Sequence, residues 1–125
     1  MTRKSIVFAG ALTVLAPPVL ADNCDPMPSG FDGVYCFAKI YHGLDAELNT
    51  AYKNLRARLT KSERQILLDA QRGWIAKRNR DCMSGASTVN LNCAIDYTRN
   101  RTRELHDLEN TCKMVGCPTT QLSRF

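Results

Sequence analysis

The side chains that could carry chemistry in this 125-residue sequence are six cysteines, two histidines and scattered carboxylates. Asp45 and Glu47 lie two residues apart, so on a helix they point about 200° apart and cannot act as one carboxylate pair. His42 and His106 fall near opposite ends of the predicted helical bundle and cannot cooperate. The sequence contains none of the metalloprotease, serine-hydrolase or phosphate-binding motifs. We therefore predict no enzyme, no cofactor and no metal site.

The N-terminus has the order of parts that is typical of a secretory signal peptide. Arg3 and Lys4 precede an apolar run over residues 5–16, two prolines interrupt it, and small residues follow up to Ala21. We predict a signal peptide over residues 1–21 and a single domain over residues 22–125, which is periplasmic or secreted. A buried core helix is the alternative for the apolar run. The run is shorter than the roughly 18 residues of a membrane span, so no span is predicted.

The charge of the chain is modest and spread along its length. The net charge is +5, and removal of the two basic residues of the signal peptide leaves +3 on the mature protein. Arg99 and Arg103 share one face of a predicted helix, whereas Arg101 points roughly the other way. Because the basic residues form no continuous patch, we predict no nucleic-acid partner.

Three stretches have the periodicity of amphipathic helices. After an irregular stretch over residues 23–33, apolar residues recur every three or four positions from Leu44 to Leu59. Thr60 and Glu63 fit a capping box, which predicts a second helix over residues 61–83. The inner face of that helix would carry Leu67, Ala70, Trp74 and Arg78. A polar loop and a third helix follow, and no stretch alternates as a strand would.

Short turns between three helices predict an all-α, up-down-up three-helix bundle, and this topology constrains the cysteines. Cys93 and Cys112 are 19 residues apart on one helix, about 28 Å, whereas a disulfide joins Cα atoms within about 7 Å. Cys112 therefore pairs with Cys117. The other four cysteines allow three pairings, of which we favour the local one: Cys24 with Cys36 and Cys82 with Cys93. A metal site formed by His106, Cys112 and Cys117 is the less favoured alternative, because an exported protein favours disulfides.

The same topology places several polar residues at shared levels of the bundle. Arg78 is expected beside Asp45 and Asp96, and Gly73 beside Asn49 and Arg101, where the glycine would make room for the Arg101 side chain. The simplest interpretation is that these groups fix the register of the helices.

Two sequence blocks resemble a known family. Residues 44–52 (LDAELNTAY) and 71–82 (QRGWIAKRNRDC), followed by Cys93 and Arg101, are similar to small exported bacterial proteins related to the N-terminal domain of the LprI-type lysozyme inhibitor. Asn79 stands where the family usually has Asp, and Cys112 and Cys117 are extra to its pattern. The pattern residues, which we expect to be structural, are Asp45, Leu48, Asn49, Tyr52, Gln71, Trp74, Arg78 and Arg101.

The resemblance implies an exported helical protein that inhibits lysozyme by protein–protein contact. A structural or stress-related envelope module with no lysozyme contact, whose partner would be another envelope protein, is the alternative. A cell-wall hydrolase is a third, weaker one. Lysozymes are commonly basic, like the mature chain, so contact would need a local acidic or neutral surface. Asp45 with Glu47, or Glu104 with Asp107 and Glu109, could form an acidic patch. The loop over residues 84–92 is the first place to seek an inhibitory surface.

Overall fold

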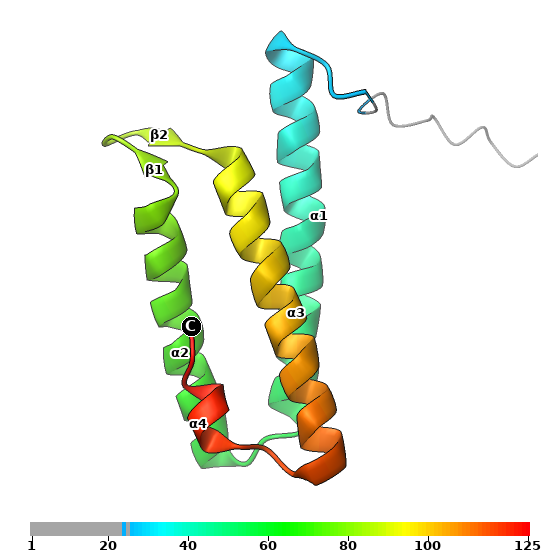
Figure 1. Ribbon diagram of the computed structural model, residues 1–125, viewed down its shortest axis with the longest axis vertical. Coiled ribbons are helices and arrows are strands. Elements are labelled where there is room, and N and C mark those ends of the chain that lie inside the picture. The colour runs from blue at the N-terminus through cyan, green and yellow to red at the C-terminus, as the bar shows by residue number, and fades with distance from the viewer. Residues whose placement is uncertain (1–23, 25) are drawn as a thin grey trace, which may run out of the picture.

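The computed structural model describes residue 24 and residues 26–125, so the predicted signal peptide lies outside the described residues. The chain runs up, down and up through three long helices, which confirms the all-α bundle (Figure 1). No described helix is long and apolar enough to cross a membrane. The elements are α1 (Gly30–Ala57), α2 (Lys61–Asp81), β1 (Met83–Ser84), β2 (Thr88–Val89), α3 (Leu91–Val115) and α4 (Thr119–Leu122).

Helix α1 begins inside the stretch that was predicted to be irregular. Gly30 starts the helix with a φ of +67°, which a glycine adopts without strain. A Cβ on Gly33 would lie 2.5 Å from the Pro28 carbonyl oxygen, so this glycine lets the preceding segment fold back over the first turn. The predicted irregular stretch was therefore too long, because two glycines accommodate a helix start there.

Helix α2 begins at the predicted capping box. The Thr60 amide donates to Glu63 Oε2 at 2.8 Å, and the Glu63 amide donates to Thr60 Oγ1 at 3.4 Å. The Thr60 amide hydrogen bond holds the pKa of Glu63 below its ordinary value. The helix ends at Asp81 rather than at residue 83, because Met83 and Ser84 pair with Val89 and Thr88 in an antiparallel hairpin.

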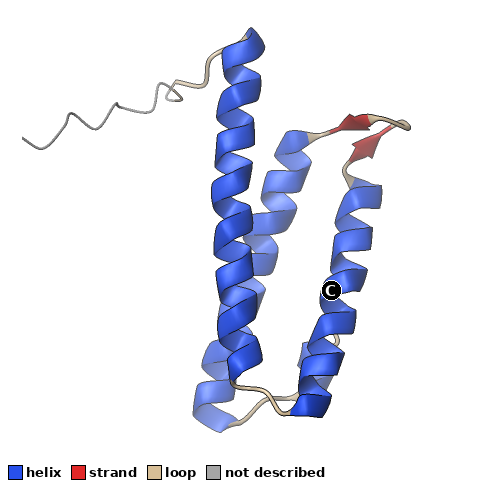
Figure 2. Ribbon diagram, turned by 180° about the vertical axis from the view of Figure 1, so that it is seen from behind, coloured by secondary structure: helices blue, strands red, loops and turns tan. Residues whose placement is uncertain are grey.

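The core lies at the end of the bundle away from the hairpin. Helix α3 packs along α1, whereas α2 stands apart from α1 and contacts α3 and α4 (Figure 2). The core contains Leu48, Ala51, Leu55, Leu59, Leu67, Trp74, Leu105, Leu108 and Leu122. Except for Leu122, these residues belong to the segments whose apolar spacing predicted the three helices.

Helix α4 and the residues after it were not predicted. Leu122 is completely buried in the core, and the Phe125 ring lies against α2 at Gly73. A Cβ on Gly73 would be 2.6 Å from Phe125 Cζ. The expectation that Gly73 makes room for the Arg101 side chain was therefore wrong, because the C-terminal segment occupies that position.

Three disulfides join the cysteines in the predicted local pattern: Cys24–Cys36, Cys82–Cys93 and Cys112–Cys117. Their Cα–Cα distances are 5.5, 5.4 and 4.3 Å. The start of α1 lies at the same end of the bundle as the hairpin, whereas α3 ends at the opposite end (Figure 1). The first two bridges therefore lie toward the hairpin end and the third at the opposite end. Because Cys112 and Cys117 are bonded to each other, their thiols are not free to bind a metal ion with His106 in this structure.

Candidate functional site

Seven of the eight residues of the family pattern line one cleft between α1 and α2, which we call the motif cleft and which has a volume of about 450 Å³. On each helix they recur at spacings of three or four, so they share one face. Leu48 and Trp74 are buried in the cleft, whereas Asp45 and Arg78 are half-buried and Asn49 is exposed. The seven are Asp45, Leu48, Asn49, Tyr52, Gln71, Trp74 and Arg78, and Leu68, Arg72 and Ile75 complete the lining.

Arg101, the eighth pattern residue, lies behind the cleft and is only 1% exposed. Its Nε donates a hydrogen bond of 3.1 Å to Gln71 Oε1. Its Nη1 donates to Glu104 Oε2 and to the Arg124 carbonyl oxygen, at 3.1 and 2.9 Å. Because Arg101 holds the oxygen of the Gln71 side chain, the Gln71 Nε2 remains the donor available on the cleft side. Arg101 therefore positions a cleft residue without lining the cleft.

The structure contradicts the expected pairing of Arg78 with carboxylates. Its guanidinium lies 5.1 Å from the centre of the Trp74 ring and 5.9 Å from that of Tyr41. Its Nε and Nη2 donate to Asn79 Oδ1 at 3.2 and 2.9 Å. Trp74 and Tyr41 thus provide cation–π contacts, and Asn79 provides a neutral acceptor.

The two expected partners of Arg78 make other contacts. Asp45 accepts a hydrogen bond of 3.3 Å from Asn49 Nδ2, and exposed Asp96 lies 3.8 Å from Arg99 Nη1. The expectation assumed that all three helices pack closely at this level. Because α2 stands apart from α1, Asp45 and Arg78 instead line opposite sides of an open cleft.

A second pocket of about 450 Å³ lies between the motif cleft and the hairpin. Arg78 lines both, so it stands at their boundary. Sequence reasoning missed Tyr41 in this pocket, although Tyr41 lies four residues before Asp45 and continues the same helical face. The remaining lining comes from Asn79, Cys82, Met83, Val89, Leu91 and Ala94.

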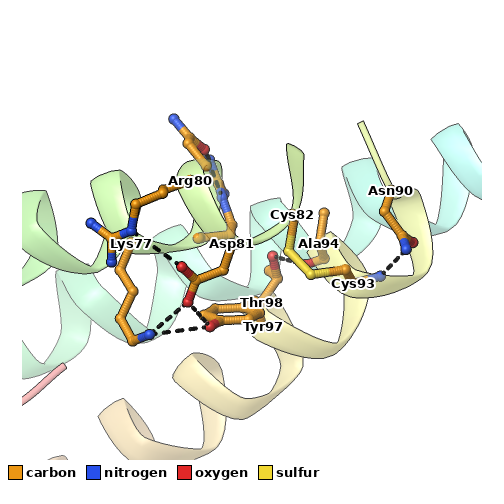
Figure 3. Close-up of a disulfide and its surroundings, with 11 residues drawn as sticks. Lys77, Arg80, Asp81, Cys82, Asn90, Cys93, Ala94, Tyr97 and Thr98 are labelled. Atoms are coloured by element: carbon orange, nitrogen blue, oxygen red, sulfur yellow. Dashed lines mark hydrogen bonds and ion pairs between the residues drawn. A yellow bond between two sulfur atoms is a disulfide. The ribbon is translucent and has the colours of Figure 1, made fainter. Parts of the chain in front are cut away.

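The base of the hairpin is fixed by a bridge and a polar network (Figure 3). Lys77 Nζ lies 2.6 Å from Asp81 Oδ2, and the Tyr97 hydroxyl donates to the same oxygen. The hydrogen bond from Lys77, and next to it that from Tyr97, lower the pKa of Asp81 to about 2. The hydrogen bond to Asp81 in turn raises the pKa of Lys77. The Asn90 amide donates to the Cys82 carbonyl oxygen at 2.8 Å, beside the disulfide with Cys93.

The predicted acidic patches do not form as expected. Glu109 is 7% exposed and lies 2.8 Å from Lys113 Nζ and 3.0 Å from Arg58 Nε, contacts that lower its pKa. Glu104 is paired with buried Arg101. Asp45 and Glu47 line different pockets, as their spacing on one helix requires. Most of these carboxylates therefore either form ion pairs within the chain or lie apart from one another.

Comparison with known proteins gives one result. A family model described as "Lysozyme inhibitor LprI" matches residues 24–105. The matched range contains the hairpin, two of the three disulfides and all eight pattern residues, but neither the Cys112–Cys117 bridge nor α4. No curated protein and no solved structure matches the chain.

Proposed function

Since the chain belongs to the LprI family of lysozyme inhibitors, we propose that it is an exported binding protein that inhibits lysozyme by direct protein–protein contact. The family match over residues 24–105 is the observation that carries this proposal. Export is supported by the predicted signal peptide over residues 1–21, which ends just before the match, and by three disulfides.

The hairpin end is the surface we assign to this contact. All residues from 83 to 89 are exposed, and the Cys82–Cys93 bridge holds the two ends of the loop together. Met83 and Val89 leave 38% and 51% of their surface exposed, and methionine is among the residue types that are enriched at interfaces. Residues 82–95 carry no charge, so the hairpin itself places no positive charge against a basic enzyme.

A lysis assay tests the proposal. The exported protein is mixed with lysozyme, and the clearing of a cell-wall suspension is followed by turbidity. We expect clearing to slow as the protein is added, and to reach a limit when the protein is in excess. Unchanged clearing would contradict the proposal in favour of an envelope module without lysozyme contact. Clearing by the protein alone would indicate a cell-wall hydrolase instead.

A matched pair of substitutions tests the contact surface. Val89→Lys places a charge on the hairpin, whereas Val115→Lys places the same charge at the end of α3, outside the matched range. Both valines are exposed, so both variants should fold. We expect Val89→Lys to weaken inhibition on the order of tenfold, about 1.4 kcal/mol, and Val115→Lys to leave it unchanged. Equal inhibition by both variants would place the contact elsewhere.

A further inference from the structure

The polar groups of the motif cleft have hydrogen-bonding capacity that the chain itself does not use. Within the described residues, the hydrogen bonds made by its polar side chains are those of Asn49 with Asp45, Arg101 with Gln71 and Arg78 with Asn79. Arg72 lines the cleft and makes no hydrogen bond or ion pair in the described chain. Gln71 is the buried polar residue of this lining, and its Nε2 makes no hydrogen bond in the described chain.

The buried Arg101 supports one lining side chain from behind the cleft. Burial of a guanidinium is costly, and the Nη2 of Arg101 has no hydrogen-bond partner in the described chain. The same side chain fixes the Gln71 carboxamide at the cleft. This support of a lining side chain by a buried neighbour is typical of binding sites whose geometry must be preserved.

The lining defines the chemistry of a ligand. Asp45 accepts hydrogen bonds, Gln71 donates one, and Asn49 can do both. Arg72 and Arg78 bring two positive charges against the single negative charge of Asp45, so the cleft has a net positive charge. Its apolar floor suits a ring, and its volume is in the range of small-molecule sites. A suitable ligand has one negative charge, several groups that both donate and accept, and an apolar face.

We propose that the cleft between α1 and α2 binds an N-acetylated amino sugar that carries a carboxylate, independently of lysozyme. The sugar hydroxyls and the acetamide group can pair with Asp45, Asn49 and Gln71, and the carboxylate with the two guanidinium groups. The apolar face of the ring lies on the floor of the cleft. A phosphate group fits less well, because a second negative charge would face Asp45.

Nuclear magnetic resonance titration of the exported protein tests this inference with three probes. N-acetylmuramic acid carries the ring, the acetamide and the carboxylate, whereas N-acetylglucosamine lacks the carboxylate and N-acetylalanine lacks the ring. We expect the first to shift the side-chain signals of Asn49, Gln71 and Trp74, with an affinity at least five times that of either other probe. Absence of binding, shifts on another face, or equal affinity for the three probes would overturn the inference.

Two exposed arginines on α2 provide the matched variants. Arg72→Gln removes a charge from the cleft, whereas Arg80→Gln removes one from a position that does not line it. We expect the first to weaken binding of N-acetylmuramic acid at least fivefold and the second to leave it unchanged. Equal binding by both variants would contradict the assigned role of Arg72. Lysozyme inhibition by the same proteins is a separate measurement, so failure of sugar binding and failure of the proposed function are distinguishable.

Discussion

The two ends of the helical bundle differ in what holds them together. At the end opposite the hairpin, Leu55, Leu67, Leu105 and Leu122 are completely buried, so apolar packing joins the helices. At the hairpin end, disulfides and the Lys77–Asp81–Tyr97 network hold the elements. Large apolar side chains remain exposed there, among them Phe31, Tyr35 and Val89. The opposite end also has a disulfide and exposed apolar residues, Met114 and Val115, so the difference lies in the buried leucine core, which the hairpin end lacks.

Truncation of a core leucine should cause the largest loss of stability among the changes that test this difference between the two ends. Leu55→Ala removes a completely buried side chain and should lower the free energy of unfolding by about 2–5 kcal/mol. Val89→Ala removes a half-exposed side chain from the hairpin and should lower it by less than about 0.5 kcal/mol. Urea titration measures both values. Equal losses would mean that the hairpin end contributes as much packing as the core.

Removal of the hairpin bridge should have a smaller and more local effect. Cys82→Ser combined with Cys93→Ser opens a loop whose ends are 11 residues apart, and should lower the free energy of unfolding by about 2–3 kcal/mol. Hydrogen exchange should accelerate at the hairpin and at Asn90, while circular dichroism retains the helix signal. The control is Cys112→Ser with Cys117→Ser at the other end, which should leave hairpin exchange unchanged. Loss of helix signal in the first variant would show that the bridge supports the whole bundle.

Acid titration should reveal the smallest effect, at Asp81. Because its pKa in the folded protein is about 2, below its ordinary value of 3.8, its stabilising contribution is complete above about pH 4 and is lost as the pH falls through about 2. Carboxyl chemical shifts measure this midpoint. Lys77→Gln removes the largest cause and should raise the midpoint toward 3.8, whereas Lys61→Gln, at the start of α2, should not change it. An unchanged midpoint in Lys77→Gln would mean that this network does not fix the hairpin base.

Much of the fold could be predicted because it depends on short-range patterns. Leucine spacing and the Thr60–Glu63 capping box identified the three helices, and the reach between cysteines on one helix identified the Cys112–Cys117 bridge. The other two bridges were the favoured one of three possible pairings, and the structure confirms them. The hairpin could not be predicted, since strands of two residues leave no alternation in the sequence. Helix α4 could not be predicted either, because the burial of Leu122 and the contact of Phe125 with Gly73 depend on tertiary packing.

The candidate site was predictable in its members but not in its arrangement. The family resemblance named Asp45, Asn49 and Gln71, and helical spacing placed them on consistent faces. Counting residues from each turn placed Arg78 and Asp45 at the same level of the bundle, and both do line one cleft. The missing information was the separation of α2 from α1, which depends on tertiary packing and leaves no local pattern in the sequence. An ion pair was therefore expected where the structure has a cleft.

The order of the disulfides along the chain has a consequence for biogenesis. Each bridge joins a cysteine to the next one in the sequence, at separations of 12, 11 and 5 residues. A thiol oxidase that links cysteines in the order in which they emerge from the export channel would thus produce the native pattern directly. No bridge has to wait for a later part of the chain, and no wrongly joined pair has to be exchanged by an isomerase. The protein is suited to maturation in a compartment that oxidises thiols quickly and corrects them slowly.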